Sequence, residues 1–167
     1  GLGVKAARAA MAPLGLVPFD DEIGRLILPA DLEAFHSFRH PQEPEYALVG
    51  SIDSVVLLRR DLASMIDPPG STRTTGPLSD LPSHGILDRG RLIGLWEFDP
   101  ESRTIAWESW VEADHALRKA VAETESFVRE QLGDARAFSL DSPKSRATRI
   151  AALRAARFPP PPGEEAG

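Results

Sequence analysis

Four basic side chains in this sequence have the charge and the spacing suited to contact with phosphate groups. Arg89 and Arg91 flank Gly90 at a predicted hairpin tip, and an arginine-tipped ribbon is a recurrent way of entering a nucleic-acid groove. Lys5 and Arg8 lie on a predicted opening helix, a position from which basic side chains can contact DNA. Exposed arginines at a turn are also ordinary solvated side chains, so the sequence leaves both interpretations open.

The segment 134–157 has a basic balance within an acidic chain. It holds six basic and two acidic residues, a local charge of +4, whereas the whole chain carries −6 and the remainder therefore −10. This asymmetry predicts one basic surface that includes Arg146 and Arg149, although an arginine-rich helix is more often a solvated face. The negative total argues against a non-specific polyanion binder.

Metal and cofactor chemistry are not expected. His36 and His40 are four residues apart, but no third ligand follows at a plausible spacing, so both are interpreted as surface residues. The chain has no P-loop and no G-x-S-x-G motif. Asp53 lies in an apolar run, where an ion pair with Arg59 or Arg60 is favoured over a catalytic role.

Composition favours a globular protein of the cytoplasm. Hydrophobic residues make up 42% and charged residues 26% of the chain, and no apolar run reaches the roughly 18 residues needed to cross a bilayer. The absence of cysteine fits a reducing compartment. The chain begins at Gly1 rather than Met, which we take as a hint that residues precede it.

The central prediction for the fold is a β-meander at residues 83–110. Three short strands are expected at about 85–87, 91–98 and 103–110, joined by tight turns. Trp96 and Trp107 are predicted to lie in the core, with an aromatic platform for nucleic-acid bases as the less favoured alternative.

Helices and loops are predicted around this meander. The residues at 113–132 have an apolar stripe at helical spacing, so this helix should cover one face of the sheet. A second helix should run from Pro143 through Arg157, with Ser142 as its N-cap. The remaining predictions are a helix at 4–12, a hairpin with strands at 16–19 and 25–28, irregular turns at 29–40, a linker at 41–44, a buried strand at 46–52, one or two helical turns within 55–66, a mobile loop at 67–82, a last strand at 137–140 and a disordered tail at 159–167.

These elements define an α+β chain in three parts. Residues 1–40 hold a helix and hairpin typical of the second half of a winged helix, and residues 45–158 hold a small antiparallel β-barrel with covering helices. Residues 159–167 form the tail.

Five segments in this order resemble the C-terminal half of a bacterial winged-helix DNA-binding family, which includes the DNA glycosylases that unhook interstrand crosslinks. The segments are GVKAARAAMAPLGLVPF, RLILP, YALVGSIDSVVLLRRDL, SHGILDRGRLIGLWEFDP and EQLGDARAFSLDSPKSRATRIAALR. The resemblance implies that residues 4–28 are a recognition helix and wing. It also implies that residues 87–96 are a barrel hairpin that probes duplex DNA, with Arg89 and Arg91 at its tip.

The resemblance implies a DNA-repair hydrolase that extrudes a base and cleaves the N-glycosidic bond. The glycosylases use a Gln-x-Gln motif, but this chain contains only Gln42 and Gln131, so no catalytic residue is carried over. Either the motif lies upstream or this member binds DNA without catalysis, and a transcription regulator or a protein-interaction scaffold remain alternatives. The expected partner is double-stranded DNA, without metal, cofactor or membrane and with a monomer favoured, and the expected DNA contacts are Lys5, Arg8, Arg89, Arg91, Arg146 and Arg149.

Overall fold

The computed structural model describes residues 3–19, 24–57, 65–66 and 81–156. The chain divides into two compact units, Gly1–His40 and Pro41–Gly167. Arg59, Arg60, Arg157, most of the predicted loop at 67–82 and the tail at 159–167 lie outside the described residues.

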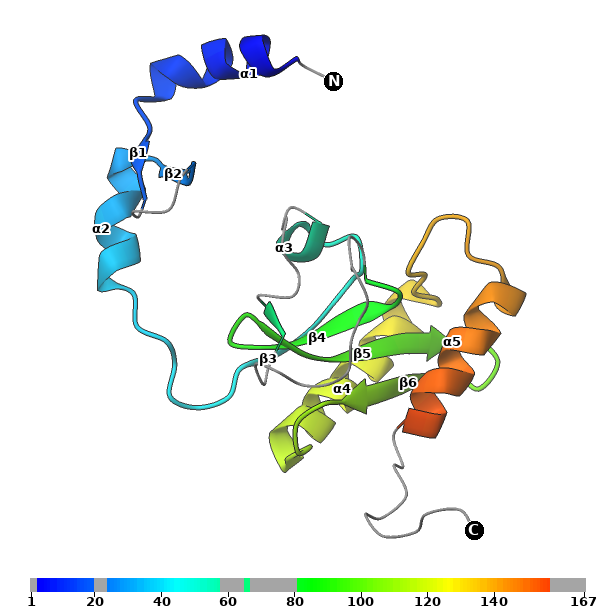
Figure 1. Ribbon diagram of the computed structural model, residues 1–167. Coiled ribbons are helices and arrows are strands. Elements are labelled where there is room, and N and C mark those ends of the chain that lie inside the picture. Colours follow the sequence, from blue (N-terminus) through cyan, green and yellow to red (C-terminus); the bar gives the residue numbers. More distant parts are fainter. Residues whose placement is uncertain (1–2, 20–23, 58–64, 67–80, 157–167) are drawn as a thin grey trace, which may run out of the picture. The chain divides into compact units, whose positions relative to one another are not determined.

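The first unit is a helix, a hairpin and a second helix (Figure 1). Helix α1 covers Val4–Met11, where a helix at 4–12 was predicted, and continues into a 3-10 turn η1 at Ala12–Leu14. Gly15 ends that turn with a left-handed φ of 58°, a conformation that glycine adopts without steric cost. Strands β1 (Val17–Pro18) and β2 (Leu26–Ile27) then pair antiparallel and form the predicted hairpin.

The helix that follows is more regular than expected. Residues Pro29–Ser37 form α2, where the sequence predicted irregular turns, because Pro29 supplies the fixed φ suited to a first helical position. Phe19 and Phe35 meet edge to face with ring centroids 4.3 Å apart. None of the described residues of this unit is buried, so its apolar side chains lie largely on its surface.

The second unit contains a four-stranded antiparallel sheet in the order β3-β4-β5-β6. The predicted meander is confirmed as β4 (His84–Asp88), β5 (Arg91–Asp99) and β6 (Thr104–Ser109). The first turn has positive φ at both central residues, 47° at Arg89 and 79° at Gly90, which matches the twist of a two-residue hairpin. The fourth strand, β3 (Tyr46–Val49), is half-buried and lies at an edge, where the sequence predicted a buried strand at 46–52.

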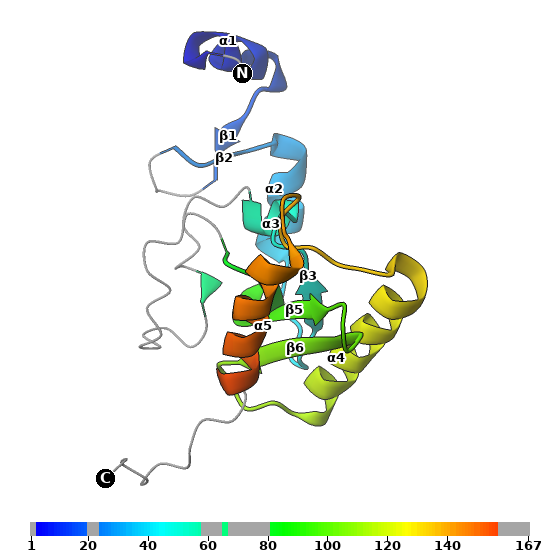
Figure 2. The same ribbon diagram turned by 90° about the vertical axis from the view of Figure 1, so that its right-hand side faces the viewer.

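Helices cover both faces of the sheet. Helix α4 (His115–Phe127) continues into a π-helical turn η3 (Val128–Leu132), and α5 (Pro143–Ala156) lies on the opposite face (Figures 1 and 2). The predicted caps are present, since Ser142 Oγ accepts a hydrogen bond from Ser145 N at 3.2 Å and Gly133 adopts a φ of 75°. Residues 137–140, predicted as a strand, instead form bends and a turn.

Two apolar clusters separate according to the alternation of side chains along β5. Trp96 and Phe98 pack with α4, while Leu95 packs with α5. Trp96 and Trp107 are only 4% and 5% exposed, which confirms their prediction as core residues. The α4 cluster also includes Ile86, Ile93, Ile105, Leu117, Val121 and Val128, and the α5 cluster includes Met65, Leu81, Leu87, Leu92, Ala106, Ile150 and Leu153.

The sheet is open in the part of the chain that the structure describes, which differs from the expected barrel. Strands β3 and β6 lie at its two edges. Because α4 and α5 bury the two faces, the apolar side chains are removed from water without closure of the sheet. Another helix of this unit is α3 (Ser54–Leu57), which fits the predicted helical turn.

Candidate nucleic-acid interface

Lys5 and Arg8 both lie on α1 and are exposed to solvent. They are three residues apart, so their side chains emerge from neighbouring positions on one side of the helix. The sequence forms a helix here because of its alanine content, and Ala12, Pro13 and Gly15 end it immediately before the β1–β2 hairpin. The first unit therefore presents a pair of cations on a helix that is followed by a hairpin.

Arg91 is the first residue of β5 and is exposed, whereas its neighbour Arg89 is engaged by its own hairpin. The Arg89 guanidinium donates to both Asp88 carboxylate oxygens, at 3.0 and 2.8 Å, and to the Gln42 carbonyl at 3.1 Å. Asp88 in turn accepts from the backbone N–H of Glu45 at 3.0 Å. Arg89 thus ties the hairpin tip to the segment that precedes β3, and Arg91 is the more available of the two expected contacts.

Two arginines of the basic surface expected along residues 134–157 form ion pairs between α5 and β5. Arg149 Nε donates to Glu97 Oε1 at 2.7 Å, and Arg154 donates to Asp99 Oδ2 at 2.6 Å. Arg146 donates at 2.6 Å to the carbonyl of Phe98, which lies between these two acidic residues in β5. Arginines near one face of α5 therefore bind three consecutive residues of β5, because the helix crosses that strand.

Arg146 is 3% exposed and cannot present its guanidinium to solvent. It forms hydrogen bonds with both oxygens of Asp134 and with the Ala135 carbonyl, which anchors the loop between η3 and α5. The Arg146 guanidinium holds the pKa of Asp134 below its usual range, despite partial burial. These contacts give Arg146 a structural role, and its guanidinium does not contribute to the candidate nucleic-acid interface.

The Arg149 side chain also contacts residues of the second unit rather than extending into solvent. Its second terminal nitrogen donates to Asp141 Oδ2 at 2.7 Å, and its guanidinium lies 5.6 Å from the centroid of the Phe138 ring. Both carboxylate partners are buried or nearly so, with side-chain exposures of 0% for Glu97 and 5% for Asp141. The candidate contact residues that remain exposed and outside such networks are Lys5, Arg8 and Arg91.

Sequence reasoning missed a buried polar group at His84. The imidazole is 3% exposed, stacks on Trp96 at 4.3 Å between ring centroids, and accepts a hydrogen bond at Nδ1 from Ser51 N at 3.0 Å. Ser51 Oγ donates to the Ala137 carbonyl, which links this group to the loop before α5. Burial, together with the positive charges of Arg146 and Arg149, lowers the pKa of His84 to about 4.

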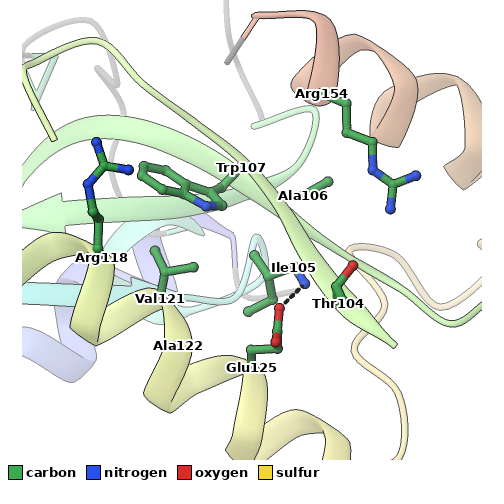
Figure 3. A pocket seen from close by; sticks show the side chains of 9 residues that line it. All are labelled: Thr104, Ile105, Ala106, Trp107, Arg118, Val121, Ala122, Glu125 and Arg154. Carbon is green, nitrogen blue, oxygen red and sulfur yellow. Dashed lines mark hydrogen bonds between the residues drawn. The ribbon is translucent and has the colours of Figure 1, made fainter. Parts of the chain in front are cut away.

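A pocket beside β6 was not predicted either. Its volume is about 390 Å³, and it lies along the outer edge of that strand (Figure 3). Glu125 of α4 accepts a hydrogen bond from Ile105 N at 2.8 Å, while Arg118 extends beside the Trp107 indole. The lining residues are Thr104, Ile105, Ala106, Trp107, Arg118, Val121, Ala122, Glu125 and Arg154.

Asp53, for which the sequence favoured an ion pair over a catalytic role, has a local structural role. Asp53 Oδ1 accepts from Val55 N at 2.9 Å and caps α3, while its predicted partners lie outside the described residues. Across the described residues, no group of three or more His, Cys, Asp or Glu side chains is arranged to hold a metal ion. No helix in the same part of the chain is long and apolar enough to span a membrane.

Comparison with known proteins returned no matching family model, no similar curated protein and no similar solved structure.

Proposed function

We propose that this chain is the DNA-binding portion of a winged-helix protein of the crosslink-repair glycosylase type, and that it contacts duplex DNA through α1 and the β1–β2 hairpin. The observation that carries the proposal is the exposed pair Lys5 and Arg8 on a helix followed directly by a two-stranded hairpin. In winged helix-turn-helix proteins a recognition helix enters the major groove. The order of elements in the first unit fits the helix and wing of that arrangement.

The physical basis of binding would be neutralisation of phosphates. The major groove is about 12 Å wide and admits one α-helix, whose basic side chains then reach the phosphates on its rims. Lys5 and Arg8 have the exposure that such contacts need. In the second unit, Arg91 at the β4–β5 hairpin supplies a further exposed cation.

The proposal assigns recognition, and no bond cleavage, to this chain. Gln42 and Gln131 lie far apart in the sequence and do not form the paired motif of the glycosylases. The activity of a whole protein of this type would be base extrusion followed by N-glycosidic hydrolysis. This chain would contribute affinity for the duplex and its orientation.

Duplex binding measured by fluorescence anisotropy over a range of salt concentrations tests the proposal. Removal of one phosphate contact should reduce the log–log salt slope by about 1, so Lys5→Ala with Arg8→Ala should reduce it by about 2 and weaken binding. Lys144→Ala, at an exposed position of α5, is the matched control and should leave the slope unchanged. The absence of salt-dependent affinity in the unaltered chain would refute the proposal.

One observation favours the alternative, a protein-interaction module. Arg149 and Arg154 pair with Glu97 and Asp99, two acids from outside the segment 134–157, which reduces its local charge from +4 to +2, and the chain as a whole carries −6. An acidic body repels DNA and suits a basic protein partner. The same anisotropy titration separates the two functions, because an interaction module would show no affinity for the duplex at any salt concentration.

A further inference from the structure

The segment that leads from the first unit into the second is held by hydrogen bonds to the β4–β5 hairpin. The second unit begins at Pro41, and residues 41–45, which we call the linker segment, lead from there to β3. Arg89 Nη1 donates to the Gln42 carbonyl at 3.1 Å, and the Arg89 backbone N–H donates to the Glu45 carbonyl at 3.1 Å. The linker segment is therefore attached to the hairpin turn near both of its ends.

Asp88 orients the Arg89 side chain for this contact. Asp88 Oδ1 accepts hydrogen bonds from Glu45 N–H and from Arg89 Nε, both at 3.0 Å, and Asp88 Oδ2 accepts from Arg89 Nη2 at 2.8 Å. A bidentate pair between an arginine and a carboxylate fixes the plane of the guanidinium, and the remaining terminal nitrogen then points at the Gln42 carbonyl. Asp88 and Arg89 thus act together on the linker segment.

The backbone of Arg89 indicates that its side chain is needed here. Arg89 has a φ of 47° and Gly90 a φ of 79°, which is the conformation of a turn that favours asparagine followed by glycine. A left-handed φ is unfavourable for a residue with a long side chain. The hydrogen bonds of the guanidinium to Asp88 and Gln42 offset this local conformational cost.

We propose that Arg89, oriented by Asp88, is a positioning residue for duplex binding, and that it holds the linker segment so that both units bind one duplex. The inference rests on the proposed function, in which Lys5 and Arg8 of the first unit and Arg91 of the second contact DNA. Two linked binding modules make the second contact intramolecular, at an effective concentration that depends on the length of the connection. Arg89 acts through the linker segment and makes no phosphate contact of its own.

The length of the connection sets the size of the effect. Residues 38–40 lie between the end of α2 and the linker segment. Release of the linker segment from the hairpin would add five residues and so more than double the length that can vary. Because effective concentration falls as about the −3/2 power of this length, release should lower it at least about threefold.

Arg89→Asn in the full chain tests the proposal. Asparagine suits the left-handed first position of this turn, so the hairpin should still form, but its short side chain does not reach the Gln42 carbonyl. In NMR relaxation measurements, the order parameters of the Gln42 and Glu43 amides should fall from about 0.85 to below about 0.6. In fluorescence anisotropy, the dissociation constant for the duplex should rise at least about threefold. The log–log salt slope should stay the same, because the number of phosphate contacts is unchanged.

Arg103→Asn is the matched control. Arg103 also has a left-handed φ, 56°, in the β5–β6 turn, and its guanidinium donates to the Arg129 carbonyl at 3.0 Å. The same substitution at this second turn removes the same charge and should change neither the order parameters of the linker segment nor the dissociation constant. Circular dichroism should show the same folded signal for each variant.

Arg89→Lys separates positioning from direct contact with DNA. Lysine keeps the charge but lacks the planar fork that binds Asp88 and Gln42 together, so this variant should also weaken duplex binding. Full affinity in Arg89→Lys, or a salt slope reduced by about 1 in Arg89→Asn, would make Arg89 a phosphate contact and overturn the positioning role.

The remaining outcomes distinguish this inference from the proposed function. Duplex affinity or order parameters that Arg89→Asn leaves unchanged would overturn the inference alone. The absence of salt-dependent affinity in the unaltered chain would overturn both. Weaker binding at an unchanged salt slope, together with a linker segment that becomes mobile in Arg89→Asn and not in Arg103→Asn, supports the inference.

Discussion

Arg149 Nε lies 2.7 Å from Glu97 Oε1, and the Glu97 side chain is fully buried. Burial by itself would lower the pKa of Arg149, but the hydrogen bonds to Glu97 and Asp141 outweigh it and raise the pKa above its ordinary value. Arg149 therefore remains ionised and attaches α5 to the sheet. A residue expected on a DNA-binding surface thus contributes to the interior of the second unit.

Arg149→Met should destabilise the fold strongly. The substitution keeps most of the side-chain volume but leaves the Glu97 carboxylate buried without its cation, which costs about 3–5 kcal/mol of unfolding free energy. Chemical denaturation measures the decrease. Arg154→Met is the matched control on the same helix, and it should cost under about 1 kcal/mol because Arg154 is half exposed.

The double variant Arg149→Met with Glu97→Gln should recover much of this stability, because a buried neutral amide costs less than an unpaired carboxylate. If Arg149→Met and Arg154→Met destabilise equally, the buried charge of Glu97 is not the cause.

The second unit should lose stability when the solution is acidified between pH 6.5 and pH 4, the ordinary and folded-state pKa values of His84. In this window the unfolded chain binds a proton at His84 and the folded chain does not, so protonation favours unfolding. Between about pH 7 and pH 5 the unfolding free energy should fall by about 2 kcal/mol from this residue.

His84→Gln should flatten that part of the profile, since glutamine can still accept from Ser51 N but does not titrate. Denaturation of both proteins at several pH values measures the difference. An unchanged slope in the variant would assign the dependence to other groups. The carboxylates with lowered pKa values, including Asp99, Asp134 and Asp141, contribute mainly at lower pH.

Gly94→Ala should destabilise the sheet. A Cβ at Gly94 would lie 2.2 Å from the backbone oxygen of Glu108, so β5 and β6 would have to separate locally. Overpacking of this kind costs about 1–3 kcal/mol. Gly50→Ala is the control, because the nearest atom to its added Cβ is His84 Nδ1 at 4.0 Å. If thermal unfolding shows the same loss of stability for both variants, the close approach of β6 to Gly94 is contradicted.

The two hairpin arginines should separate into a structural and a binding residue. Arg89→Ala removes the contacts with Asp88 and Gln42 and should lower the unfolding free energy by about 1–2 kcal/mol. Arg91→Ala should leave stability unchanged and reduce the salt slope of DNA binding by about 1. Denaturation and anisotropy measurements on both variants check these two expectations. If Arg91→Ala lowers stability and Arg89→Ala reduces the salt slope, the two roles are exchanged.

Local sequence patterns were sufficient for the meander and for the helices that cover it. Strands β4, β5 and β6, the helix at 113–132 and the helix beginning at Pro143 all follow from side-chain periodicity and capping residues, which act over a few positions. The burial of Trp96 and Trp107 follows from the same alternation. The predicted strand at 137–140 was wrong, because Asp141 accepts the Phe138 N–H and stabilises a turn.

The sequence by itself determined the meander, the helices that cover it and the number of charges. Only the tertiary structure decided where those charges point. Whether Arg146 and Arg149 face solvent or the sheet depends on the crossing of α5 over β5, which brings together residues about fifty positions apart. The same long-range packing places Arg118 and Glu125 of α4 beside β6, which ends the described sheet.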